Sequence, residues 1–339
     1  MDAFDLKTYG YHLPEELIAQ EPVFPRDKAR LMVIDRVKQT ISHDTFNQLD
    51  KYLPPKSVLV LNDSKVVPAR LLGRREDTGG EVEIFLLKRL SDGYTYQTLL
   101  RPLKRLKQGE KISFGKGELV AEIVDKENRL VRLNKKNISS SLEKFGHMPL
   151  PPYIKRSDGA MDRKYYQTVY AKKDGSVASP TAGLHFTTRL LEKISRAGHD
   201  IHKVTLHINY ATFKPVEESD IRNHPIHSED YEVAKGTVKA IQKAKAEGKK
   251  IVSVGTTATR VLETVGTTGS LKGRTNIFIY PGYQFKMMDV LITNFHLPFS
   301  TLLMLVYAFG TRDLMSRAYQ EAVKEKYRFF SYGDGMMIL

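Results

Sequence analysis

The chain of 339 residues contains neither cysteine nor tryptophan. The absence of cysteine excludes disulfides, thiolate metal sites, iron–sulfur clusters and cysteine nucleophiles, and it is typical of a reducing compartment. The N-terminal stretch carries acids where a signal peptide needs basic residues before an apolar run. The most apolar stretch, Leu302–Phe309, has about half the length of a membrane span. We therefore expect a cytoplasmic protein.

Four familiar sequence signatures are also missing, namely GxGxxG after a strand, GxxxxGK[ST], HExxH and GxSxG. Their absence argues against ordinary dinucleotide enzymes, P-loop enzymes, zincins and α/β-hydrolases. The nearest approach to an anion site is VGTTATR, residues 254–260, because a strand that ends in glycine before a helix start aims free amide groups at an anion. A plain turn with a capping threonine explains the same letters, so both interpretations stay open.

The charge of the chain is strongly basic. Fifty-three Lys and Arg residues stand against 39 Asp and Glu residues, which gives a formal net charge of +14. This excess favours a polyanionic partner, namely RNA, DNA or an acidic membrane surface. Solvated surface charge without a partner is the alternative.

The pattern of apolar residues changes along the chain. From Ser57 to Leu133, short apolar runs separated by turn signals predict a small antiparallel barrel or sandwich. After the proline-rich hinge Met148–Lys155, helical and extended patterns are mixed. We predict a mixed α/β catalytic domain, residues 1–56 plus 150–339, with an inserted small antiparallel β-barrel, residues 57–149. The predicted helices of the α/β part are Thr188–Ala197, Lys235–Gly248, one from Thr256, Ser300–Phe309 and Asp313–Lys326, and its strands are VTLHI, IVSVG and NIFIY.

Five of the ten histidines fall in polar, loop-like motifs. Two of them, His185 and His296, lie between hydrophobic residues and beside small hydroxyls, which suits a tuned acid or base in a semi-closed pocket. A zinc or iron centre that includes Glu229 is an alternative, but no compact ligand pair on a predicted helix supports it, and we expect no metal site. A hydrogen-bonded structural role is the plain alternative for each histidine.

Long motifs resemble a known family in its own order and over essentially the whole chain. They are PLPPYIK, YYQTVYAKKDGSVASPTAGLHFT, HSEDY, VGTTATRVLET, TNIFIYPGYQFK, TNFHLPFSTLLMLV and YRFFSYGDGMMIL, with LIAQEPVFPRDKARLMV and LVLNDSKVVPARL before them. These motifs are similar to those of the S-adenosylmethionine:tRNA ribosyltransferase-isomerase family of queuosine biosynthesis.

The resemblance implies a transferase that uses S-adenosylmethionine as a ribosyl donor. The ribosyl part is moved onto 7-aminomethyl-7-deazaguanine at the wobble position of a tRNA and isomerised, which gives epoxyqueuosine-tRNA, adenine and methionine. The implied partners are S-adenosylmethionine and the tRNA anticodon loop. No cofactor beyond that co-substrate, no membrane and no obligate protein partner are expected.

Such chemistry needs a base beside the sulfonium, an acid for the departing adenine and donors near the forming epoxide oxygen. The resulting catalytic candidates are His185, His296, Thr181 and Asn294. Gly183 would let the backbone approach a flat ligand. The candidates for binding the methionine carboxylate are Thr256, Thr257 and Arg260. The other substrate-binding candidates are Glu229 and, as aromatic faces for the sulfonium, Tyr280, Tyr283 or Phe295.

A wobble base lies in a single-stranded loop, where proteins stack bases on aromatics and hold phosphates with Lys and Arg. Arg101, Lys104 and Arg105 belong to the densest basic run of the predicted barrel and are candidates for tRNA binding. Arg26, Arg30 and Lys65 lie in motifs that match the family and are further candidates. A solvated barrel loop is the alternative interpretation of the basic run.

One segment departs from the family pattern. Where the family usually has HVGxGTF, this chain has HINYATF, residues 207–213. Asn209 can take a left-handed backbone, but Ala211 does so only with strain, and Tyr210 adds bulk. A non-catalytic or repurposed tRNA-binding relative is therefore the second hypothesis, and a metal-dependent hydrolase is the third.

Overall fold

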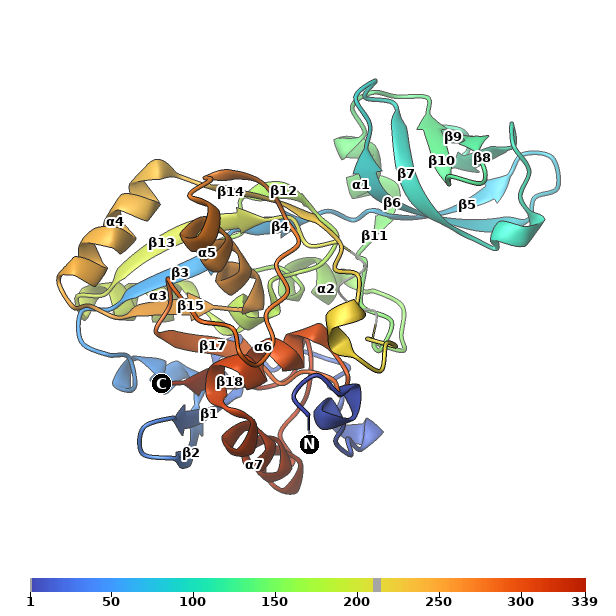
Figure 1. Ribbon diagram of the computed structural model, residues 1–339. Helices are drawn as coiled ribbons and strands as arrows, with labels where there is room; N and C mark the ends of the chain where they lie inside the picture. Colours follow the sequence, from blue (N-terminus) through green and yellow to red (C-terminus); the bar gives the residue numbers. More distant parts are fainter. Residues whose placement is uncertain (1, 210–214) are drawn as a thin grey trace. The chain divides into compact units, whose positions relative to one another are not determined.

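A computed structural model describes residues 2–209 and 215–339, which form two compact units (Figure 1). The larger unit comprises Met1–Lys65, Pro151–Arg156 and Tyr165–Leu339, and the smaller unit comprises Val66–Leu150 and Ser157–Lys164. The mixed α/β class with an inserted antiparallel barrel is confirmed. The break lies after Lys65, so residues 57–65 belong to the larger unit and not to the barrel.

The larger unit is built on a nine-stranded mixed sheet. Its four central strands run parallel. All five residues of β3, VLVLN, are buried, as expected for a strand covered on both faces. In order across the sheet, the strands are β16 (Lys272–Thr275), β14 (Glu229–Val233), β13 (Asp200–Leu206), β3 (Val58–Asn62), β15 (Ile251–Val254), β17 (Val290–Asn294), β18 (Gly335–Ile338), β1 (Arg30–Asp35) and β2 (Thr40–Thr45).

Helices cover both faces of this sheet, because alternate residues of a strand point to opposite sides. On β1, Met32 and Ile34 pack into one core cluster, while Leu31 and Val33 pack into the other. The first cluster also contains buried side chains of α4 (Lys235–Ala246), α5 (Thr256–Thr268), α6 (Thr301–Gly310) and α7 (Arg312–Lys324). The second contains those of α3 (Thr188–Arg196) and of the 3₁₀ helices η4 (Phe46–Lys51) and η6 (Thr181–His185).

The smaller unit is a closed antiparallel barrel of six strands, because β5 pairs with both β6 and β8. Burial alternates along β9, which is typical of strands with one inward face. Around the barrel the strands are β5 (Arg70–Arg75), β6 (Glu81–Arg89), β7 (Thr95–Arg101), β10 (Leu130–Leu133), β9 (Leu119–Asp125) and β8 (Lys111–Phe114). The remaining elements near it are α1 (Ser139–Phe145), β11 (Gly146–His147) and α2 (Ala160–Tyr165).

The predicted elements of the α/β part are largely present, with one error. The NIFIY segment, residues 276–280, forms no strand, and the strand of this region is the preceding β16. The hydroxyl of Thr275 accepts the amide hydrogen of Ile277 at 3.2 Å, and the apolar side chains that follow pack on the core from an irregular segment. Within residues 2–209 and 215–339, no helix is long and apolar enough to cross a membrane.

Candidate active site

A cavity of about 140 Å³ lies at the carboxyl ends of the central parallel strands, where open α/β sheets generally bind ligands. Ile208 follows β13, Gly255 follows β15, and Asn294 ends β17. All three line the cavity. Segments that are far apart in the sequence therefore meet there because their strands are neighbours in the sheet.

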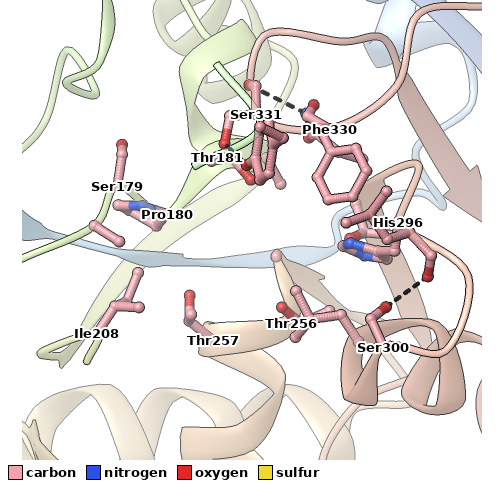
Figure 2. A pocket seen from close by; sticks show the side chains of 18 of the residues that line it. Ser179, Pro180, Thr181, Ile208, Thr256, Thr257, His296, Ser300, Phe330 and Ser331 are labelled. Carbon is pink, nitrogen blue, oxygen red and sulfur yellow. Dashed lines mark hydrogen bonds between the residues drawn. The ribbon is translucent and has the colours of Figure 1, made fainter. Parts of the chain in front are cut away.

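The cavity wall is neutral and rich in hydroxyl groups (Figure 2). In the part of the chain that the structure describes, no Asp, Glu, Lys or Arg lines it, and His296 is its one histidine. A cationic ligand therefore meets no fixed positive charge in this wall. The hydroxyl groups come from Tyr153, Ser179, Thr181, Thr256, Thr257, Thr293, Ser300 and Ser331.

His296 is held rigidly in this wall. Its Nε2 lies 2.9 Å from the Oγ1 of Thr293, and its backbone amide donates to the hydroxyl of Tyr319 at 3.1 Å. The hydroxyl of Tyr11 donates to its carbonyl oxygen at 2.5 Å. Burial lowers the pKa of His296 to about 3, so the ring is neutral at pH 7. A neutral imidazole with a fixed orientation can accept or relay a proton.

His185 lies behind the cavity and touches it through Asn294. Its Nε2 is 3.2 Å from Asn294 Oδ1, while Asn294 Nδ2 donates to the carbonyl oxygens of Phe330 (2.8 Å) and Ser331 (3.4 Å). Because the amide nitrogen faces two carbonyls, the amide oxygen faces His185, whose Nε2 must carry the proton. Burial lowers the pKa of His185 to about 4. Its ring packs against Phe46, with centroids 4.7 Å apart.

The first turn of α5 faces the cavity, and the arginine one turn later does not. Gly255 has φ +88°, which glycine adopts without strain, and the amides of Thr256 and Thr257 have no acceptor within the helix. Both threonines line the cavity. Arg260 instead forms a buried ion pair with Glu229 and lines a separate cavity of about 50 Å³. The three residues predicted to bind the methionine carboxylate, Thr256, Thr257 and Arg260, therefore line two different cavities.

The glycine of the SPTAGLHF segment has a packing explanation. A Cβ atom on Gly183 would lie 2.0 Å from the hydroxyl oxygen of Tyr170 and 2.8 Å from Cγ2 of Thr168. The backbone thus approaches the protein's own side chains, whereas the sequence predicted an approach to a ligand. Thr181, two residues earlier, does line the cavity.

The aromatic candidates for the sulfonium lie outside the cavity wall. Phe295 is fully buried, with its ring packed between those of Tyr319 and Phe329. Tyr280 packs against Phe4 and Phe278. The hydroxyl of Tyr283 donates to Glu263 at 3.1 Å.

Two aromatic residues that the sequence did not single out, Tyr153 and Phe330, line the cavity instead. Phe330 has φ +72°, a conformation that side chains rarely adopt. Ser331 and Ile208 are further lining residues that were missed. The sequence held a signal for three of these four residues, because Tyr153 lies in the motif PLPPYIK and Phe330 and Ser331 lie in YRFFSYGDG, and both motifs resemble the family.

The candidates for tRNA binding lie in different surroundings. Arg26 lines a small cavity together with His185. The guanidinium of Arg30 stacks 3.7 Å from the centre of the Tyr327 ring, and Lys65 pairs with Asp174 at 3.2 Å. Arg101, Lys104 and Arg105 belong to a cluster of exposed cations that runs from the last residue of β7 to the first residue of β8. We call this cluster the β7–β8 basic loop; its five cations are Arg101, Lys104, Arg105, Lys107 and Lys111.

The HINYATF segment, which differs from the family pattern, is held by a hydrogen bond at Asn209. The amide of Asn209 donates to Glu229 Oε1 at 2.8 Å, and the other oxygen of this carboxylate pairs with Arg260. Tyr210 and Ala211 lie outside the described residues. Among the residues that are described, no group of three or more His, Cys, Asp or Glu side chains could hold a metal ion.

Comparisons with known proteins agree on one family. Residues 6–338 match the family described as "Queuosine biosynthesis protein". An S-adenosylmethionine:tRNA ribosyltransferase-isomerase from a Sulfurihydrogenibium strain is 52% identical over 98% of this chain and 99% of that protein. One of the same name from a Thermoanaerobacter strain is 50% identical over 98% of each. The crystal structure of the S-adenosylmethionine tRNA ribosyltransferase from Thermotoga maritima is 38% identical, with a TM-score of 0.57 over 100% of both chains.

Proposed function

We propose a function from the premise that this chain belongs to the family of queuosine biosynthesis proteins. The chain is an S-adenosylmethionine:tRNA ribosyltransferase-isomerase, as its relatives of about 50% identity are named. The resemblance seen in the sequence is thereby confirmed. The reaction is transfer and isomerisation of the ribosyl part of S-adenosylmethionine on a 7-aminomethyl-7-deazaguanine at the tRNA wobble position, with release of adenine and methionine.

The neutral, hydroxyl-lined cavity is the observation that supports this reaction best. A sulfonium cation meets no fixed positive charge there, and the rings of Tyr153 and Phe330 are aromatic partners for it. The methionine carboxylate binds at the first turn of α5, where Thr256 and Thr257 line the cavity and their amides have no acceptor within the helix. Arg260 then contributes by holding Glu229, and not by touching the carboxylate.

The acid–base work falls to His296, the histidine of the cavity wall. As a neutral imidazole it can remove the proton next to the sulfonium, with Thr293 orienting its Nε2. Thr181 and Ser331 are donors for the developing epoxide oxygen. Asn294 holds the Phe330–Ser331 backbone, and His185 is a positioning residue that fixes the Asn294 amide.

The tRNA is held partly by the β7–β8 basic loop. Its five cations are exposed, and no carboxylate within the described ranges forms an ion pair with them. The buried side chain of Leu106 anchors the loop, so the cations are presented from a fixed base. Exposed cations with no internal partner are suited to the phosphates of an anticodon loop.

The direct test uses tRNA that carries 7-aminomethyl-7-deazaguanine at the wobble position. This tRNA is incubated with S-adenosylmethionine and the protein, and free adenine and the mass of the tRNA are measured. We expect one adenine for each ribosyl-derived mass gain, and no adenine from a tRNA with ordinary guanine at that position. Binding of tRNA without adenine release, by folded protein, would instead support the non-catalytic relative.

The His296→Ala variant tests the assignment of the acid–base group. General acid–base catalysis contributes about 10²- to 10⁴-fold, so adenine release should fall by at least about 100-fold. Ser195→Ala, in the exposed part of α3, is the matched control. A His296→Ala variant that is folded and fully active would remove His296 from the mechanism.

A further inference from the structure

A second cavity, of about 50 Å³, shares a wall with the active-site cavity, and we call it the His224 cavity. Three motifs that resemble the family contribute to its lining, namely HSEDY, VGTTATRVLET and TNIFIYPGYQFK. The proposed chemistry needs an acid for the departing adenine as well as a base. Among the described residues that line the active-site cavity, His296 is the one histidine, and it already serves as the base. The acid must therefore come from a neighbouring place.

His224 is oriented in the wall of the His224 cavity by a carboxylate. Its Nδ1 lies 2.7 Å from Oε2 of Glu218, which lies outside the cavity wall. This hydrogen bond holds the pKa of Glu218 below its usual value, so the carboxylate is ionised at neutral pH. Because a carboxylate only accepts, Nδ1 carries a proton, and Nε2 is the ring nitrogen left for a ligand. In the described chain, Nε2 has no hydrogen-bond partner.

Arg260 adds a hydrogen-bond donor without an acceptor to the same wall. Its Nη1 is engaged by Glu229, and its Nε donates to the carbonyl oxygen of Ile277 at 3.3 Å. Within the described ranges, its Nη2 is buried and has no hydrogen-bond partner. A buried donor without an acceptor costs free energy, which favours a neutral ligand that brings an acceptor. The rest of the wall consists largely of isoleucine, leucine, proline and phenylalanine side chains.

The two cavities are placed to hold two parts of one ligand. Leu302 lines both of them. Along α5, Thr256 and Thr257 line the active-site cavity, and Arg260, about one helical turn or 5.4 Å further on, lines the His224 cavity. A molecule whose methionine part lies at the first turn of α5 therefore reaches the His224 cavity with its other end.

We propose that the His224 cavity receives the adenine of S-adenosylmethionine and that His224 is the acid that protonates adenine as it leaves. A purine suits this wall, because its faces are apolar and its edge carries ring nitrogens that accept hydrogen bonds from Arg260 and His224. The cavity is smaller than the roughly 150 Å³ that encloses a benzene ring, so it admits one edge of the purine. This assignment rests on the proposed function, which supplies the substrate, and adds a base subsite and an acid to it.

The step balances in protons and electrons. The bond between the ribosyl carbon and N9 of adenine breaks, and its electron pair goes to the adenine ring. The proton on Nε2 of the His224 imidazolium passes to a ring nitrogen, so adenine departs neutral and His224 becomes neutral. Glu218 keeps the Nδ1 proton in place throughout. The pair that leaves with adenine is replaced, within the ribosyl part, by the pair released when His296 removes the proton next to the sulfonium.

The His224→Gln variant tests the acid, because glutamine is polar but cannot give up a proton. With the substrate tRNA and saturating S-adenosylmethionine, adenine release should fall by about 10²- to 10⁴-fold, while the Kd for S-adenosylmethionine changes little. His202→Gln, at a half-buried position of β13 outside both cavities, is the matched control. An S-adenosylmethionine analogue with 2-fluoroadenine in place of adenine should restore part of the lost rate, because a less basic leaving group needs less protonation.

Two further variants test the positioning residue and the base subsite. Glu218→Gln keeps an acceptor for Nδ1 of His224 and should retain most of kcat, whereas Glu218→Ala should lower kcat and leave KM unchanged. Ile226 lines the His224 cavity and not the active-site cavity, so Ile226→Phe narrows the His224 cavity alone. This variant should weaken the binding of free adenine by at least about ten-fold and leave the binding of free methionine unchanged.

The outcomes separate this proposal from the proposed function. A folded His224→Gln variant that releases adenine at the wild-type rate would overturn the acid assignment. An equal deficit with adenine and with 2-fluoroadenine as leaving base would also overturn it, since a purely structural role is indifferent to the leaving group. Equal effects of Ile226→Phe on adenine and methionine would overturn the base subsite. Selective weakening of adenine by Ile226→Phe, without any adenine release by the wild-type protein, would overturn the proposed function alone.

Discussion

The requirement for glycine at position 183 gives a quantitative test of the site. A Cβ atom there would lie 2.0 Å from the Tyr170 hydroxyl oxygen, closer than real Cβ contacts allow. We expect Gly183→Ala to destabilise the protein by about 1–3 kcal/mol, the usual cost of overpacking. In the described chain the Tyr170 hydroxyl is buried without a hydrogen-bond partner, so Tyr170→Phe by itself should cost little.

The double variant isolates the contact. With Phe at position 170, the new Cβ still meets Cζ at 3.0 Å and Thr168 Cγ2 at 2.8 Å, so the cost of Gly183→Ala should shrink by about 1 kcal/mol but not vanish. Urea unfolding of the wild type, both single variants and the double variant measures this coupling. An equal cost of Gly183→Ala in both backgrounds would refute the packing explanation. A stable Gly183→Ala variant that no longer binds S-adenosylmethionine would favour close approach to the ligand instead.

Three further predictions concern charge. The pKa values of His185 and His296 lie below 6.5, so on acidification the unfolded chain binds protons that the native chain does not. The free energy of unfolding should therefore fall from about pH 6.5 to pH 4, by up to about 1.4 kcal/mol per pH unit for each histidine. His296→Gln should flatten the dependence of the urea midpoint on pH, and an unchanged dependence would contradict this explanation. Glu229→Gln leaves Arg260 buried without its carboxylate and should lower the free energy of unfolding, measured by thermal unfolding, by about 3–5 kcal/mol. Glu232→Gln, at an exposed position of the same strand, should lower it by less than about 0.5 kcal/mol. Equal effects of the two substitutions would count against the stabilising role of the ion pair. Glutamines in place of Arg101, Lys104 and Arg105 of the β7–β8 basic loop should weaken tRNA binding and reduce its salt slope by about 0.7 per lost phosphate contact, and an unchanged slope would exclude the loop from the tRNA interface.

The sequence by itself determined the family, the fold class and most local elements. The barrel strands from β6 to β10 and the helix α5 follow from short-range patterns of apolar residues, glycines and turn signals. The Ser300 cap is likewise local, since its hydroxyl oxygen accepts the amide hydrogen of Leu303 at 3.2 Å. Motif by motif, the resemblance also identified the segments that line the cavity.

Only the tertiary structure decided which side chains of those segments face one another. His185 and Asn294 are 109 positions apart, and their hydrogen bond places the histidine behind the cavity wall. Arg260 and the threonines of α5 are close in the sequence, yet the ion pair with Glu229 directs the arginine to another cavity. The physical reason is that a side chain's orientation depends on partners brought in by strands from elsewhere in the chain, and neither spacing nor composition encodes those partners.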